Sequence, residues 1–376
     1  MATQYNINVT RRCNLRCAHC FVEPEALSSS GRTMSFVSWR MAIDRIAEHV
    51  VDRRREDPSD VGVRIQVMGG EPTLLAEDWH EEALRLARGG LAEVGARASF
   101  RIASNLTTDR SAEICALYDG ASTSWDAGRF PDRRTEAAWE ARVRSLSASG
   151  IRMGTEVTML RSVLGRPPEE TASRILSLGV RDLHFSAFIP RSWAGDFPGS
   201  GDVPSNDEVS AFLIRLARIR EALRDEFPDA EVHPVDSALA SAAANDPVFS
   251  VASDSVCPIH GGSFNVDWDG GVALCTNDGV GGVSERLGDL GTASFSSLVS
   301  SEAAIRRRTE AVSPRRVCSG CDEYAACLGG CSLLHRSWDG TGECPGYRTF
   351  LSWLRRSARF SRQAPFPNLR EAESRA

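Results

Sequence analysis

Short apolar runs alternate with longer amphipathic segments through the first half of the chain. The short runs are rich in apolar and β-branched residues and predict strands, whereas the segments between them repeat apolar positions every three or four residues and predict helices. This order predicts an α/β fold built as a partial (β/α)6, TIM-like barrel, with its chemistry at the carboxyl ends of the strands. The strands are expected at residues 5–9, 63–68, 99–103, 120–125, 152–159 and 182–189. The helices between them are expected at residues 36–53, 78–87, 109–117, 134–149 and 168–178.

The pattern changes after Pro190. Residues 191–205 are rich in Gly, Pro and Ser and predict a loop, a helix is expected at 207–227, and an Ala-rich stretch at 237–245 predicts a short bridging helix. From Cys257 onward, Gly- and Asp-rich turns punctuated by Cys replace the helical period, as expected where metal sites organise the fold. We therefore expect four parts: the barrel at 1–205, a bridging helical segment at 206–250, a small Cys-rich domain at 251–350, and a C-terminal helix and tail at 351–376.

Composition and charge narrow the functional classes. The chain has 376 residues and a net charge of −6, and all of its 44 cationic residues are Arg. A nucleic-acid-binding domain is normally basic, so nucleic acid is not expected as a partner. The first ten residues do not have the pattern of a secretory signal, and no apolar run approaches the roughly 18 residues that a membrane-spanning helix needs. We expect a cytoplasmic protein without a membrane partner.

Ten of the eleven cysteines fall into two groups. The first is Cys13-x3-Cys17-x2-Cys20, which follows the first predicted strand. Short, unequal spacings in a chain with no export signal favour iron–sulfur or zinc ligation over disulfides, because thiols in the cytosol stay reduced. The second group has the array Cys257-x12-Gly270-x4-Cys275, then Cys318-x2-Cys321-x5-Cys327-x3-Cys331, then Cys344.

The first group can hold three irons of a four-iron cluster. Its fourth iron would then be open to chelation by an amine and a carboxylate of a ligand, as catalytic metal sites keep one position free. A zinc knuckle with His19 as the fourth ligand, or three buried cysteines without metal, remain alternatives at this point. Gly69, Gly70 and Glu71 end the second predicted strand, where two glycines let the backbone approach a ligand and the carboxylate suits an ammonium group.

With the motif Met68-Gly69-Gly70-Glu71-Pro72-Thr73, the chain resembles the radical S-adenosylmethionine (SAM) superfamily, in which a cysteine triplet and a GGEP motif have this order and position. The resemblance implies that the cysteine triplet holds the catalytic 4Fe–4S cluster and that its open iron binds the amino and carboxylate groups of SAM. It also implies that the GGEP segment meets the SAM ammonium and that His19 lies beside the adenine, where the family usually has Tyr or Phe. The residues implied as cofactor-binding are His19, Gly69, Gly70, Glu71, Pro72, Ser104, Asn105, Ser124, Val157 and Phe188. For the last five, a strand-end residue that satisfies loop backbone is the alternative interpretation.

The second group resembles the SPASM extension of some radical SAM enzymes in every spacing and in Gly270. The resemblance implies two auxiliary 4Fe–4S clusters, hence three clusters and SAM as the cofactors. It assigns Cys257, Cys275 and Cys331 to the first auxiliary cluster, and Cys318, Cys321, Cys327 and Cys344 to the second. Because the first then has three thiolates, its fourth iron is open or is bound by His260 or Asp254. A pair of zinc sites is the alternative for the array, and Cys115 is interpreted as a buried packing thiol.

The resemblance implies an enzyme that reductively cleaves SAM to a 5′-deoxyadenosyl radical and abstracts a substrate hydrogen atom. A ribosomally made peptide is the favoured substrate, to be crosslinked or dehydrogenated. The alternatives are a small metabolite such as a sugar, aminocyclitol or nucleoside, and a non-catalytic iron–sulfur or zinc scaffold. Sulfatase maturation is in doubt, because Thr276 follows Cys275 where those enzymes have an acid, and Asp278 comes two residues later.

The expected partners are a flavodoxin- or ferredoxin-type reductant and a separate peptide-recognition protein. The residues expected at the mouth of the barrel, where they could meet substrate, are Glu156, His184, Arg191 and Trp193.

Overall fold

The computed structural model of the protein describes residues 3–17, 19–20, 22, 24–28, 31–58, 62–189, 200–243, 259, 262–277, 286–313, 315–327 and 329–361. Its centre is one ten-stranded sheet with the order β10-β9-β8-β1-β2-β3-β4-β5-β6-β7, in which β1 to β7 are parallel to their neighbours. The parallel strands are β1 (Thr3–Thr10), β2 (Gly62–Gly69), β3 (Arg97–Ala103), β4 (Gly120–Ser124), β5 (Arg152–Met159), β6 (Asp182–Ala187) and β7 (Glu231–His233).

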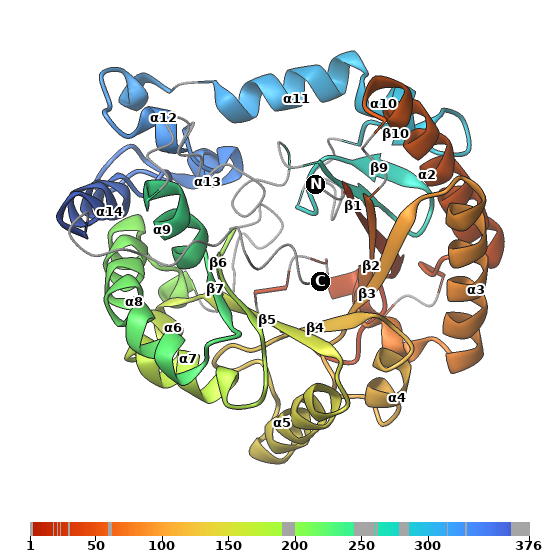
Figure 1. Ribbon diagram of the computed structural model, residues 1–376, viewed down its shortest axis with the longest axis horizontal. Coiled ribbons are helices and arrows are strands. Elements are labelled where there is room, and N and C mark those ends of the chain that lie inside the picture. Colours follow the sequence, from red (N-terminus) through yellow and green to blue (C-terminus); the bar gives the residue numbers. More distant parts are fainter. Residues whose placement is uncertain are drawn as a thin grey trace.

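Helices cover the outer side of this curved sheet (Figure 1). The longest of them begin at polar caps: the Ser35 side chain accepts a hydrogen bond from the Ser38 backbone, and Ser205 and Glu208 form a reciprocal capping box. Such caps satisfy backbone groups that have no partner inside the helix. The outer helices are α2 (Phe36–Glu56), α3 (Glu77–Glu93), α4 (Ser111–Cys115), α5 (Arg133–Ala148), α6 (Arg161–Leu164), α7 (Pro168–Leu176) and α8 (Asn206–Glu226).

The strands have one apolar and one polar side. Ile7, Val67 and Ile102 lie side by side in the sheet and are buried in the hydrophobic core with the outer helices. Their neighbours along the strands point the other way, because successive side chains of a strand alternate. Gln66 is one of these, and its side-chain nitrogen reaches the Ser122 hydroxyl, two strands away, at 3.1 Å. The inner side of the barrel is therefore polar, which is unusual for a parallel sheet and suits a site for a polar ligand.

The Cys-rich region is joined to the barrel through the same sheet. β8 (Ser263–Val266) lies parallel to β1, and β9 (Gly271–Ala273) and β10 (Gly288–Asp289) continue the sheet in antiparallel order. Backbone pairing between β1 and β8 places the segment between Cys257 and Cys275 beside the strand that leads into the first cysteine group. The remaining helices are α1 (Pro24–Leu27), α9 (Val235–Ala243), α10 (Phe295–Val299), α11 (Glu302–Val312), α12 (Tyr324–Cys327), α13 (Ser332–Ser337) and α14 (Arg348–Ser361), and the 3-10 turns are η1 (Pro72–Leu74), η3 (Ser200–Asp202) and η4 (Arg316–Cys318).

The α/β class and the partial barrel expected from the sequence are confirmed. All six expected strands are present, although β4 ends at Ser124 and β6 at Ala187, and the structure adds the short parallel strand β7. The division into four parts remains a prediction. Within the described residues, none of the helices has the length and apolar character needed to cross a membrane.

Candidate functional site

The first cysteine group lies in the loop between β1 and α1. This loop is folded back on itself, since the Cys13 amide donates to the Leu27 carbonyl at 3.1 Å and the Cys20 amide to the Cys17 carbonyl at 3.0 Å. Cys13 and Cys20 also pack against a small apolar cluster that includes Val22 and Leu27. The loop thus holds three thiols at the carboxyl end of β1, where the sequence placed them.

Each thiol of this loop receives hydrogen bonds from nitrogen donors. Backbone amides two residues further along donate to the sulfurs of Cys13 and Cys20, both at 3.4 Å. Asn105 Nδ2 lies 3.7 Å from the Cys13 sulfur, and an Arg129 guanidinium nitrogen lies 3.6 Å from that of Cys17. Burial raises the pKa of Cys13 to about 12 and also raises the pKa of Cys17. A metal must therefore displace these protons, and N–H donors to the sulfurs are typical of iron–sulfur sites.

A buried ion-pair network joins the cysteine loop to the end of β4. The Asp126 carboxylate lies 2.9 Å from Arg129 and 3.2 Å from His19 Nε2, and Arg129 Nη2 lies 3.2 Å from the same ring nitrogen. Burial opposes the charge on Asp126, but Arg129 and His19 together hold the pKa of that carboxyl below its usual value. Burial likewise opposes the charge on Arg129, yet Asp126 and Cys17 raise its pKa. His19 is therefore held in place by Asp126 and Arg129 at the edge of the first cysteine group.

The glycine pair at the end of β2 is required by contact with the cysteine loop. Gly69 has φ +142°, and a Cβ on it would lie 2.1 Å from the Thr10 carbonyl oxygen. A Cβ on Gly70 would lie 2.1 Å from the Arg12 oxygen, and the Gly70 amide donates to Thr10 at 2.7 Å. The sequence predicted close approach of this backbone to a ligand; in the structure it closely approaches the strand end and loop that carry Cys13.

Glu71 is the centre of a buried hydrogen-bond network. Its carboxylate accepts bonds from the Thr73 amide at 3.0 Å, the Thr73 hydroxyl at 2.6 Å, the Ser104 hydroxyl at 2.8 Å and the Asn105 amide at 2.6 Å. Burial raises its pKa despite these four donors. Glu71 thus ties the end of β2 to the end of β3 and holds Asn105 against Cys13. Contact of Glu71 with a SAM ammonium remains a prediction, and Pro72 is buried at the start of η1.

A row of polar residues crosses the inner side of the barrel next to this site. Ser124, Glu156, His184 and His233 are aligned by strand register on β4, β5, β6 and β7. The rings of His184 and His233 stack with centroids 4.5 Å apart, and the Ser186 hydroxyl donates to the Glu156 carboxylate. Burial lowers the pKa of His184. These residues place hydrogen-bonding groups beside the end of β4.

Val157 and Phe188 are placed differently from this row. Val157 is fully buried in the core on the outer side of β5, so only its backbone could contact a ligand inside the barrel. Phe188 follows β6 and is half-buried. Their roles as SAM contacts remain predictions, and Arg191 and Trp193 lie outside the described residues.

The second cysteine group is partly described. Cys318, Cys321, Cys327 and Cys344 line one cavity, and a Cβ on Gly346 would lie 3.0 Å from the Cys327 sulfur. Burial raises the pKa of Cys327 to about 11, so this thiol also needs a metal to lose its proton. Four thiols line this cavity, and Gly346 adds no side chain to it. This arrangement fits the donor set of a 4Fe–4S cluster.

Of the three cysteines assigned to the first auxiliary cluster by resemblance, the structure describes two. Cys275 is buried just after β9, and Cys331 precedes α13, whereas Cys257, His260 and Asp254 lie outside the described residues. Among the cysteines that are described, the structure has no disulfide, and Cys115 is buried in the core as expected. In the same part of the chain, no three His, Cys, Asp or Glu side chains form a site for a single metal ion.

Sequence reasoning missed the residues that support the cysteine loop. Asp126, Arg129 and Thr73 were not among the predicted site residues. Arg11, directly after β1, was also missed, although it forms a buried bidentate pair with Asp267, with N–O distances of 3.1 and 2.6 Å. The signal available in the sequence was a charged residue that lies close to a strand end and near a cysteine of a metal-binding group.

Comparisons with known proteins agree with this arrangement. The family model SPASM, an iron–sulfur cluster-binding domain, matches residues 257–322. No relative was found among curated proteins. The structure of anSMEcpe with bound AdoMet superposes with a TM-score of 0.74 at 16% identity, covering 96% of this chain and 94% of that chain. Streptococcus suis SuiB bound to its precursor peptide SuiA superposes with a TM-score of 0.55 at 13% identity, covering 90% of this chain and 74% of that chain.

These matches extend the resemblance found in the sequence. The barrel carries the cysteine triplet and the GGEP motif at adjacent strand ends, and the domain match covers Cys257 to Asp322, which includes four cysteines of the array. The chain therefore has the radical SAM fold and carries a SPASM iron–sulfur cluster-binding domain in its C-terminal third.

Proposed function

We propose that this protein is a radical SAM/SPASM oxidoreductase or maturase that modifies a ribosomally made peptide by oxidation. The observation that carries the proposal is the contact between the three-thiol loop and Gly69-Gly70-Glu71 at the carboxyl ends of β1 and β2. A 4Fe–4S cluster with SAM bound there would supply reductive cleavage of SAM and a 5′-deoxyadenosyl radical for hydrogen abstraction.

Residues of this chain would hold the cluster and SAM in position. Cys13, Cys17 and Cys20 would hold the cluster, and Asn105 and Arg129 donate hydrogen bonds toward the sulfurs. Hydrogen bonds to the sulfurs tune the reduction potential of such a cluster. The GGEP segment, held in place by the Glu71 network, would bind SAM next to the cysteine loop.

The polar row inside the barrel is the proposed substrate-facing surface. Ser124, on β4, is the member of this row nearest to β1 and β2 in the strand order, followed in register by Glu156 and His184. A hydrogen atom abstracted from a substrate leaves a radical, and net oxidation then needs loss of one electron and one proton. Glu156 is the exposed carboxylate of this row and is the proposed proton acceptor.

A peptide substrate is supported by what two proteins of the same fold bind. The structures of anSMEcpe include one with AdoMet and a Cp18Cys peptide, and SuiB is bound to the precursor peptide SuiA. The proposal further includes three 4Fe–4S clusters, a flavodoxin- or ferredoxin-type reductant, a separate peptide-recognition protein and a cytoplasmic location. A small metabolite as substrate is the competing outcome that a substrate screen decides.

The test is formation of 5′-deoxyadenosine from SAM by the anaerobically reconstituted protein under dithionite. We expect the wild-type protein and Cys115→Ala to form it, because Cys115 is a packing thiol outside both cysteine groups. The triple variant Cys13→Ala/Cys17→Ala/Cys20→Ala should form none. Deoxyadenosine formation by the triple variant, or its absence from the iron-loaded wild type, would contradict the proposal.

A further inference from the structure

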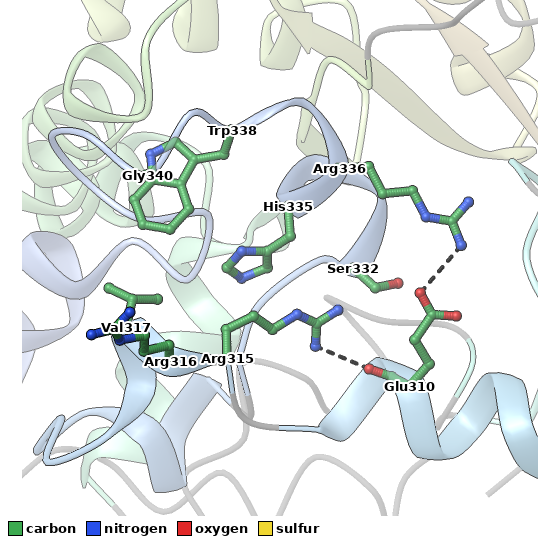
Figure 2. Close-up of a pocket in the computed structure, with 9 residues that line it drawn as sticks. All are labelled: Glu310, Arg315, Arg316, Val317, Ser332, His335, Arg336, Trp338 and Gly340. Carbon is green, nitrogen blue, oxygen red and sulfur yellow. Dashed lines mark hydrogen bonds and ion pairs between the residues drawn. The ribbon is translucent and has the colours of Figure 1, made fainter.

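A large open cavity lies in the Cys-rich region, beside helices that lie between the cysteines of the array. Its volume is about 700 Å³, and its walls come from the end of α11, from η4 and from α13. Figure 2 shows Arg315, Arg316 and Arg336 around this cavity, with His335 and Trp338 on its α13 side. It is distinct from the proposed SAM site, which lies at the ends of the barrel strands.

The rim of the cavity is strongly cationic. We call Arg306, Arg315, Arg316 and Arg336 the arginine patch; Arg306 lines an adjoining hollow together with Arg315. The one acid in the cavity wall, Glu310, lies 3.2 Å from Arg336. Arg306 and Arg316 are exposed, and the described residues place no carboxylate within ion-pair distance of either. A surplus of positive charge on an otherwise acidic protein attracts an anionic partner.

The cavity shares a wall with the space between four thiols. Val317 and His335 line both this cavity and the one formed by Cys318, Cys321, Cys327 and Cys344. Val317 is 44% exposed, which is unusual for a large apolar residue in the described part of the chain. An exposed apolar centre with arginines around it has the composition of a protein–protein interface.

A continuous bonded path leads from the cavity to one of these thiols. Trp338 contacts His335 edge-on with ring centroids 5.6 Å apart, and His335 Nε2 is hydrogen-bonded to the Gly329 carbonyl. The Gly329 amide in turn donates to the Cys327 sulfur at 3.4 Å. A group that docks on this cavity would therefore be connected to a cluster on Cys327 through a few bonded or touching atoms.

We propose that the arginine patch is the docking surface for an acidic electron carrier of the ferredoxin type, which removes one electron from the cluster on Cys318, Cys321, Cys327 and Cys344. The proposal rests on the proposed function, in which oxidation of the substrate leaves an electron to be removed. The cluster loses one electron, the oxidised carrier gains it, and no bond is formed or broken. Electron-transfer encounters are small and governed by charge, as a patch of four arginines around one valine would be.

Binding is measured with an oxidised plant-type 2Fe–2S ferredoxin and the reconstituted full-length protein, by calorimetry at low and at high salt. We expect salt-sensitive binding by the wild type and on the order of tenfold weaker binding, with a smaller salt dependence, by Arg306→Glu/Arg316→Glu. The control Arg40→Glu/Arg134→Glu makes the same change in net charge on exposed arginines of α2 and α5, which lie on the outer side of the barrel (Figure 1). This control should bind as the wild type does.

Three results would overturn the docking surface: no salt-sensitive binding by the wild type, equal weakening in both double variants, or an acidic peptide that competes for the patch while ferredoxin does not. A second readout is the bleaching of ferredoxin absorbance after mixing with the reduced protein, which should slow in Arg306→Glu/Arg316→Glu alone. Both double variants should form 5′-deoxyadenosine under dithionite like the wild type. If neither the wild type nor the variants formed 5′-deoxyadenosine while the binding results were as expected, the proposed function would be refuted. The docking surface would then still be supported.

Discussion

At the scale of single residues, the candidate site depends on glycine positions with no room for a larger side chain. A Cβ on Gly70 would lie 2.1 Å from the Arg12 oxygen and 2.5 Å from the Arg11 oxygen, so Gly70→Ala must push the cysteine loop away. We expect a loss of stability of about 1–3 kcal/mol, typical of overpacking, together with less iron bound on reconstitution.

Gly89→Ala is the matched control for this change. Gly89 lies within α3, and a Cβ there would have no neighbour within 4 Å, so the alanine should stabilise the helix by roughly 0.5–1 kcal/mol. Urea unfolding and iron per chain measure both variants. Equal iron content and equal stability in Gly70→Ala and Gly89→Ala would show that the loop does not need this close approach.

His80 gives the site a dependence on pH. It is fully buried, its Nδ1 lies 2.7 Å from the Tyr118 hydroxyl and its Nε2 lies 3.2 Å from the Pro72 carbonyl, and burial lowers its pKa to about 4 from 6.5. The unfolded chain therefore takes up this proton first as the pH falls. The stability that neutral His80 contributes is complete above pH 6.5 and is lost between pH 6.5 and 4, by about 3 kcal/mol.

The measurement is urea unfolding at several pH values between 7 and 4 for the wild type and His80→Gln. A glutamine amide can donate to Pro72 and accept from Tyr118 but does not titrate in this range. The difference in unfolding free energy between the two proteins should therefore change with pH by about the stated amount. A constant difference would mean that the pKa of His80 is the same in the folded protein as in the unfolded chain.

At the scale of secondary-structure elements, β1 couples the two groups of cysteines. It pairs with β2 on one side and with β8 on the other, and Arg11 at its end forms the buried pair with Asp267, which follows β8. Asp267→Asn removes the carboxylate that pairs with Arg11 in the interior and with the half-exposed Arg286 at 2.7 Å. Breaking such a buried pair costs about 3–5 kcal/mol, so we expect a loss of stability of that order.

Asp269→Asn is the control at this junction, because Asp269 pairs with the half-exposed Arg286 at 2.8 Å. An ion pair at the surface contributes about 0–1 kcal/mol, so this variant should unfold close to the wild type. Limited proteolysis should also cleave Asp267→Asn faster between barrel and SPASM region. Similar unfolding of the two variants would mean that the buried charge of Asp267 does not stabilise this junction.

The helices and strands were predictable from the local sequence pattern, whereas the contacts that support the cysteine loop were not. Strand β5 was expected at its observed bounds, because a β-branched run between two turns is readable from neighbours in sequence. Strand β7 was missed because it has three residues, too few for a period, and exists through its pairing with β6. The cysteines were found from their spacing alone, but the donors Arg129 and Asn105 are 112 and 92 residues away from the sulfurs that they approach. Only the folded sheet brings such distant residues together.

At the scale of the whole molecule, the number of iron–sulfur clusters depends on both the barrel and the Cys-rich region. The triplet and the array together offer ten thiolates, and three four-iron clusters require about twelve irons per chain. The cavity lined by Cys318, Cys321, Cys327 and Cys344 is separate from the triplet loop, so the two sites should fill independently. We expect about eight irons in Cys13→Ala/Cys17→Ala/Cys20→Ala and about eight in Cys318→Ala/Cys321→Ala.

Iron and sulfide counting with electron paramagnetic resonance of the reduced proteins checks this expectation. Each variant should lose one signal and keep the other signals unchanged, because the remaining thiols keep their own hydrogen-bond donors. Cys115→Ala serves again as the control and should hold as much iron as the wild type, since its thiol is buried among core residues. About eight irons in the wild type would mean that the protein binds two clusters and that Cys257, Cys275 and Cys331 do not hold a third. Loss of all iron in either variant would show instead that the two halves assemble their clusters as one unit.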